Sequence, residues 1–109
     1  MSDAVIVLTT VPSPDVGEEL GRTLVDERLA ACVNVLPPMV SVYRWKGVVQ
    51  RDTECQVVIK TARVRVDALQ ERLGELHPYD LPEFVVILVD GGDPAYLAWV
   101  VEQTAAESE

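Results

Sequence analysis

Two short runs of consecutive apolar residues, near opposite ends of the chain, constrain its fold most. Residues 4–8 read AVIVL and residues 84–89 read FVVILV. Runs this short and this rich in β-branched residues favour strands over helices. A strand points successive side chains to opposite faces of its sheet, so each run presents apolar side chains on both faces. A fold for this chain must therefore cover both faces of its sheet.

Three other segments repeat apolar residues at helical spacing. The first begins at Ser13-Pro14, a favourable N-cap followed by a proline suited to the first turn, and is expected to end near Leu29-Ala30. The second ends before Pro78, and the third begins at Asp93. The expected inner stripes are Val16, Leu20, Leu24 and Val25, then Val66, Leu69, Leu73 and Leu76, then Leu97, Val100, Val101 and Thr104.

Two glycines in the first predicted helix indicate a close neighbour. Gly17 and Gly21 lie one turn apart on one side, although each glycine costs a helix up to ~1 kcal/mol relative to alanine. Together they would let the helix backbone lie close to another element.

Residues 32–61 show no helical spacing and are interpreted as a long antiparallel hairpin. Lys46-Gly47 supplies the turn, with a positive φ at Gly47. Pro37-Pro38 cannot lie in an unbroken central strand, so the first arm must bend or bulge there. Arms of about 13 residues would span ~40 Å, so the tip should project beyond a domain whose radius of gyration is ~13 Å.

The expected element order is β-α-β-β-α-β-α within one domain over residues 1–109. This order predicts the α+β class, with a ferredoxin-like βαββαβ sandwich followed by a C-terminal helix. Both main helices would cover the same face of the sheet. The apolar opposite face would then exceed what a soluble monomer exposes, which predicts a homo-oligomer.

The balance of acidic and basic residues indicates which kinds of binding partner are unfavourable. Eighteen acidic against nine basic residues give a formal net charge of −9. This charge argues against nucleic acid and anionic membranes, whereas cations would be attracted weakly. The alternative is that the acidity serves solubility alone. No apolar run is long enough to span a membrane, and the start of the chain lacks signal-peptide character, which predicts a cytoplasmic protein.

His77 and Glu83 are the candidate metal ligands, because imidazole and carboxylate suit copper or zinc. The alternative is that His77 satisfies the last carbonyls of the helix it ends. Cys32 and Cys55 are expected to be reduced core residues, since the hairpin register keeps them apart. With one histidine and no nucleophile motif, the sequence predicts no enzyme and no required cofactor.

Lys60 and the exposed aromatics leave further alternatives. Lys60 lies near the end of an apolar strand, where it either extends to solvent or faces a ligand cleft. Tyr43, Trp45 and Trp99 are expected to pack at an interface, because large aromatic side chains bury much area at low entropic cost.

Several motifs along nearly the whole chain resemble one known family. They are residues 28–34 (RLAACVN), 43–47 (YRWKG), 59–61 (IKT), 77–83 (HPYDLPE) and 96–99 (YLAW). Together they resemble the divalent-cation tolerance (CutA) family. The resemblance implies a ferredoxin-like subunit in a PII-like homotrimer, with a function in tolerance of copper and other divalent metals.

The resemblance also implies a metal site. Some bacterial members bind copper through a cysteine after the first strand together with the histidine and glutamate that match His77 and Glu83. Thr9 stands at the cysteine position here, which removes the soft ligand that favours Cu(I). The alternative hypothesis is a PII-like trimeric sensor that binds a small molecule or nucleotide in a cleft between subunits, with candidate lining residues Trp45, Glu54, Lys60, Tyr79 and Trp99.

Overall fold

The computed structural model describes residues 2–106. The chain runs through β1 (Ala4–Val11), α1 (Pro14–Asp26), β2 (Cys32–Val35), β3 (Met39–Trp45), β4 (Val48–Ala62), the short 3-10 helix η1 (Arg63–Arg65), α2 (Val66–Leu76), β5 (Val85–Leu88) and α3 (Pro94–Gln103). The antiparallel sheet has the order β2-β4-β1-β5, and β3 pairs with the outer part of β4. The ferredoxin-like order with an added C-terminal helix is confirmed. None of the described helices is long and apolar enough to cross a membrane.

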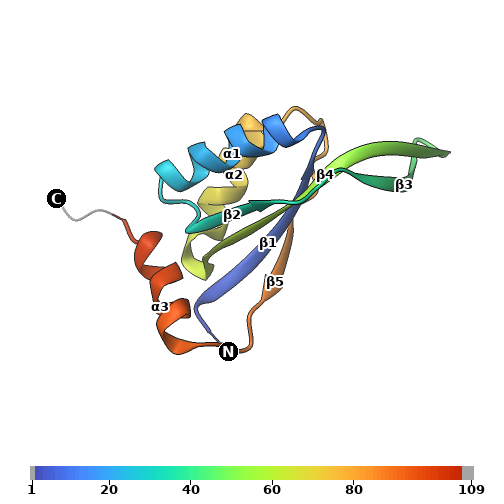
Figure 1. The fold of residues 1–109 in the computed structure, drawn as a ribbon. Coiled ribbons are helices and arrows are strands. Elements are labelled where there is room, and N and C mark those ends of the chain that lie inside the picture. The colour runs from blue at the N-terminus through green and yellow to red at the C-terminus, as the bar shows by residue number, and fades with distance from the viewer. Residues whose placement is uncertain (1, 107–109) are drawn as a thin grey trace.

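The main core lies between the sheet and helices α1 and α2, which cover the same face (Figure 1). Alternate residues of the central strands β1 and β4 point into this core, where they pack against the apolar faces of the two helices. Its fully buried members include Val5, Val7, Val57 and Ile59 from the strands and Leu24, Leu69 and Leu73 from the helices.

Local signals fixed both predicted N-caps. The Ser13 hydroxyl accepts a hydrogen bond from the Val16 N–H at 3.3 Å, and the Asp93 carboxylate accepts one from the Tyr96 N–H at 2.9 Å. The predicted end of the first helix was wrong, because α1 ends at Asp26. Arg28 adopts φ 60°, a left-handed conformation that stops a helix. Val25, expected in the inner stripe, is exposed.

The hairpin is bent where the two prolines predicted. Lys46 and Gly47 both have positive φ, 49° and 80°, as a tight two-residue turn requires. The pairing passes from Met39↔Glu54 to Val35↔Val57, so the β2–β3 side carries one extra residue around Pro37-Pro38. The outer hairpin, formed by β3 and residues 48–54 of β4, projects from the body of the subunit (Figure 1). The longest dimension of the whole subunit is 47 Å.

The second face of the sheet is only partly covered. Helix α3 lies apart from α1 and α2 (Figure 1), and its Val100 packs with Ala4 and Ala31 at one end of that face. The interpretation of residues 84–89 as a buried strand was wrong for the single subunit, because all four β5 side chains are exposed by 39–52%. The reason is that β5 is an edge strand. Val86 and Leu88 lie on the face that carries α1 and α2, Val85 and Ile87 lie on the second face, and neither pair is fully covered. The uncovered part of the second face, formed by Val85 and Ile87 of β5 together with Ile6 and Leu8 of β1, is called the open face below.

Candidate functional site

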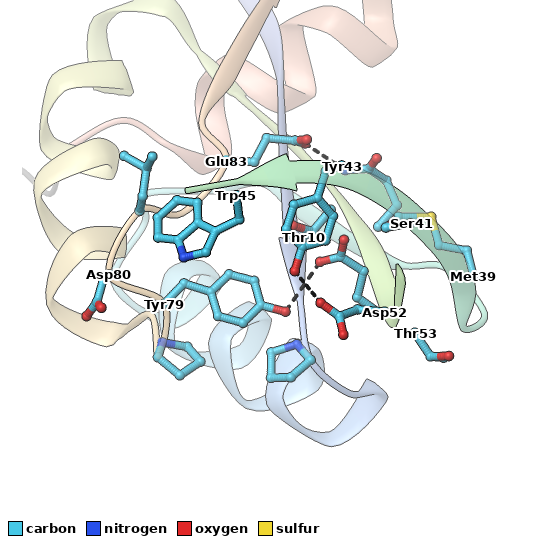
Figure 2. A pocket seen from close by; sticks show the side chains of 15 residues that line it. Thr10, Met39, Ser41, Tyr43, Trp45, Asp52, Thr53, Tyr79, Asp80 and Glu83 are labelled. Atoms are coloured by element: carbon cyan, nitrogen blue, oxygen red, sulfur yellow. Dashed lines mark hydrogen bonds between the residues drawn. The ribbon is translucent and has the colours of Figure 1, made fainter. Parts of the chain in front are cut away.

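A pocket of about 860 Å³ lies where the hairpin leaves the sheet (Figure 2). Strands β3 and β4 form one wall, and the loop after α2 forms the other. The pocket is lined by Thr10, Pro12, Met39, Ser41, Tyr43, Trp45, Asp52, Thr53, Glu54, Gln56, Pro78, Tyr79, Asp80, Leu81 and Glu83. We call it the hairpin pocket.

Strand alternation places the polar groups of the hairpin wall. Met39 pairs with Glu54 and Ser41 with Asp52, so these four side chains share one face of the ribbon. Tyr43 and Trp45 continue this alternation along β3, and Gln56 continues it along β4. One face of a two-stranded ribbon therefore supplies seven of the fifteen lining residues.

Two tyrosine–carboxylate pairs fix the acidic groups. The Tyr43 hydroxyl donates to Asp52 Oδ2, and the Tyr79 hydroxyl donates to Glu54 Oε1 at 3.3 Å (dashed in Figure 2). The bond to Asp52 raises the pKa of Tyr43 above its usual value. Burial, followed by the charge of Glu54, raises the pKa of Tyr79 to about 12. The Tyr79 phenol therefore stays protonated at physiological pH and continues to donate to Glu54.

Gln56 joins the loop wall to the strands. Its Nε2 donates to the Thr9 carbonyl at 2.6 Å and to Glu83 Oε2 at 3.0 Å. A single side-chain amide thus ties β4 to the end of β1 and to the loop that carries Glu83. This fixes the pocket's loop wall relative to the sheet.

The lining of the hairpin pocket is strongly acidic. It contains the carboxylates of Asp52, Glu54, Asp80 and Glu83, and its fifteen residues include no lysine, arginine or histidine. A concave site lined by charge of one sign concentrates the electric field, so the pocket attracts cations and repels anions.

His77 lies beside this pocket and does not line it. Its ring is buried, and Nε2 lies 2.7 Å from the Thr10 carbonyl while Nδ1 lies 3.1 Å from the Tyr79 backbone N–H. Because a carbonyl only accepts and an N–H only donates, Nε2 carries the proton and Nδ1 accepts. Both nitrogens are therefore used within the subunit, and the ring bonds β1 rather than its own helix.

The copper ligand set implied by the family resemblance does not fit this arrangement. Thr9 is completely buried, and its hydroxyl has no hydrogen-bond partner in the described structure. His77 has no free nitrogen, and no group of three or more histidine, cysteine, aspartate or glutamate side chains among residues 2–106 is arranged to hold a metal. Copper binding by His77 and Glu83 stays a prediction that would require His77 to give up one of its hydrogen bonds.

The structure separates the five residues predicted for an inter-subunit cleft. Trp45, Glu54 and Tyr79 line the hairpin pocket, whereas Lys60 and Trp99 do not. The Lys60 ammonium lies 5.9 Å from the Tyr96 ring centroid, and the Tyr96 and Trp99 centroids are 5.7 Å apart. These side chains form a second group at α3, outside the hairpin pocket.

Sequence reasoning missed Asp52 and Gln56 and assigned Tyr43 to interface packing. The missed signal was the strand period, because residues two positions either side of Glu54 must share its face.

The cysteines are both free, but only Cys55 is a core residue. Cys32 is half-buried and pairs with Lys60, outside the main core, which corrects that prediction.

Comparison with known proteins agrees with the motifs and the fold. The family model described as "CutA1 divalent ion tolerance protein" matches residues 5–103. The chain belongs to this family. It is 44% identical over 99 residues to the divalent-cation tolerance protein CutA of Thermus thermophilus, covering 91% of this chain and 96% of that protein. It is 40% identical to the chloroplastic CutA of Arabidopsis thaliana, covering 93% of this chain and only 56% of the plant protein.

Solved structures of the family have the same fold. CutA from Xylella fastidiosa superposes with a TM-score of 0.92 at 44% identity, covering 95% of this chain and all of the other. A CutA of Archaeoglobus fulgidus, described as periplasmic, gives a TM-score of 0.90 at 26% identity and covers 94% of this chain and 99% of the other. CutA proteins are thus described from more than one compartment.

Proposed function

We propose that this CutA protein acts in the tolerance of divalent cations as a homotrimer that binds a divalent ion weakly and catalyses no reaction. The observation that supports cation binding is the hairpin pocket, which has four carboxylates and no cationic side chain in its lining. Asp52 and Glu54, two residues apart on one strand face, are the ligands that we favour. Ions such as Mg²⁺ are commonly held by one or two carboxylates while keeping several waters.

The trimer is supported by the open face and by the family resemblance. The exposed Val85 and Ile87 and the half-buried Ile6 and Leu8 form a continuous apolar surface, which is unusual for a monomer. A second apolar surface lies on the other face of the outer hairpin from the pocket, where Val40, Val42 and Val49 are more than half exposed. Copies of the same chain are the simplest cover for both, and three is the number that the resemblance implies.

The alternative of a PII-like nucleotide sensor has less support from the site. A nucleotide needs positive side chains or backbone N–H groups around its phosphates. Of the candidate cleft residues only Lys60 carries a positive charge, and it lies outside the acidic pocket.

We also propose that the protein is cytosolic, which the two free cysteines support. The absence of catalysis is supported by His77, whose nitrogens are both engaged.

Titration calorimetry with Zn(II) and Cu(II) tests the metal-binding part. We expect Asp52→Asn with Glu54→Gln to weaken binding at least tenfold, because each lost charge-assisted contact contributes about 1.5–3 kcal/mol. Glu71→Gln, which removes one negative charge from an exposed site on α2, should leave binding unchanged. Glu83→Gln and His77→Gln decide the ligand set implied by the family resemblance. Loss of binding only in those two variants would contradict the assignment to Asp52 and Glu54.

A further inference from the structure

Three aromatic side chains line the hairpin pocket, and a hydrated metal ion gains little from contact with them. Tyr43 and Trp45 come from β3 and Tyr79 from the loop wall (Figure 2). The exposed fraction is 41% for both Tyr43 and Trp45, so large aromatic surface faces the pocket uncovered in the subunit. The volume of about 860 Å³ is also that of a site for a small organic molecule rather than a bare ion.

The protein's own side chains show that one of these rings accepts an ammonium group. The Lys46 Nζ lies 5.9 Å from the centroid of the Trp45 ring. This distance is within the range of a cation–π interaction, in which the negative face of the ring attracts a positive charge. A ligand cation entering the pocket would meet the same kind of surface with carboxylates beside it.

We propose that the hairpin pocket binds an alkylammonium ion, with an ammonium group between the Asp52 and Glu54 carboxylates and the Trp45 ring and its carbon chain against the two tyrosines. Each carboxylate accepts one phenol hydrogen bond, through one of its oxygens, and keeps acceptor capacity for an ammonium N–H. The phenols hold the carboxylates in place, and the rings add apolar contact that a metal ion cannot use. The inference shares its carboxylates with the proposed cation site but does not require that any metal binds.

The ligand class follows from the combination of these features. Carboxylates alone would favour any cation, and aromatic rings alone would favour any flat apolar molecule. Both together, with no positive side chain in the lining, favour a ligand that is cationic at one place and apolar at another.

Calorimetry with putrescine tests the proposal, with butane-1,4-diol as a neutral ligand of the same chain length and Mg²⁺ as an ion of the same charge. We expect putrescine to bind, butane-1,4-diol not to bind, and Trp45→Leu to weaken putrescine about tenfold, as the loss of a partly desolvated cation–π contact predicts. Trp45→Phe, which keeps an aromatic face, should retain most of the affinity. Trp45→Leu should leave Mg²⁺ binding unchanged.

Three results would overturn the inference. They are equal affinity of the wild type for putrescine and butane-1,4-diol, no putrescine binding at millimolar concentration, or equal putrescine affinity in the wild type and Trp45→Leu. The metal proposal fails separately, because it depends on Zn(II), Cu(II) and the carboxylate variants and not on Trp45. Circular dichroism of each variant checks that the fold is intact, and Trp45 is at the exposed hairpin, outside the core.

Discussion

Replacing Ile87 by lysine is expected to convert the proposed trimer into folded monomers. Ile87 is 42% exposed in the subunit and pairs with Ile6 on the open face. If copies of the chain cover this face, each subunit would bury an unpaired ammonium group at the interface, which costs several kcal/mol. Every 1.4 kcal/mol is tenfold in the association constant, so dissociation at micromolar concentration follows. Sedimentation velocity measures the change, and circular dichroism confirms that the subunit stays folded.

The matched control is Val64→Lys. Val64 lies in η1, is 85% exposed, and belongs neither to the open face nor to the outer hairpin. This variant introduces the same charge on the same chain and should sediment as the wild type does. An Ile87→Lys protein with the mass of the wild-type assembly would show that the open face is not an interface.

Alanine at Gly17 and alanine at Gly74 should change stability in opposite directions, although both glycines are in helices. A Cβ at Gly17 would lie 2.9 Å from Val35 Cγ1 and 3.2 Å from Val11 Cγ2. Both valine side chains are stiff at χ1, so relief requires backbone movement. We expect Gly17→Ala to lower the free energy of unfolding by about 1–2 kcal/mol, since overpacking of 1–3 kcal/mol exceeds the helix propensity gained.

Gly74 provides the control. A Cβ there would meet no atom within 4 Å, so Gly74→Ala should raise the free energy of unfolding by up to ~1 kcal/mol through helix propensity alone. Urea denaturation at one fixed protein concentration measures both, because an oligomer's stability depends on concentration. The double variant Gly17→Ala with Val35→Ala should be more stable than the sum of the two single changes in the free energy of unfolding predicts, because the smaller side chain removes the clash. A Gly17→Ala variant as stable as Gly74→Ala would contradict the close packing of α1 on β2.

Much of the fold was predictable because its signals are local. Ser13 and Asp93 cap their helices as their positions predicted, and Pro37-Pro38 mark the bend in the hairpin. The end of α1 was missed because it depends on a left-handed Arg28, and neither Gly nor Asn marks that position. The apolar pattern of β5 correctly predicted a strand but could not say whether its cover belongs to the same chain.

The candidate site was predictable only in part, for a geometric reason. The PII-like hypothesis indicated Trp45, Glu54 and Tyr79, which the structure brings together in one pocket. It also indicated Lys60 and Trp99, which lie in a separate group because β4 is 15 residues long and Lys60 is near its other end. The sequence could not show that both nitrogens of His77 are already hydrogen-bonded. One partner is the nearby Tyr79, but the other is Thr10, which only the folded chain brings to the ring.

Sedimentation equilibrium of the wild-type protein in dilute buffer tests most directly whether the subunit needs copies of itself. We predict one species of three times the subunit mass of 12.0 kDa, with native circular dichroism. A well-folded particle of 12.0 kDa at the same concentration would contradict this. It would mean that the exposed β5 strand and outer hairpin tolerate water without a partner.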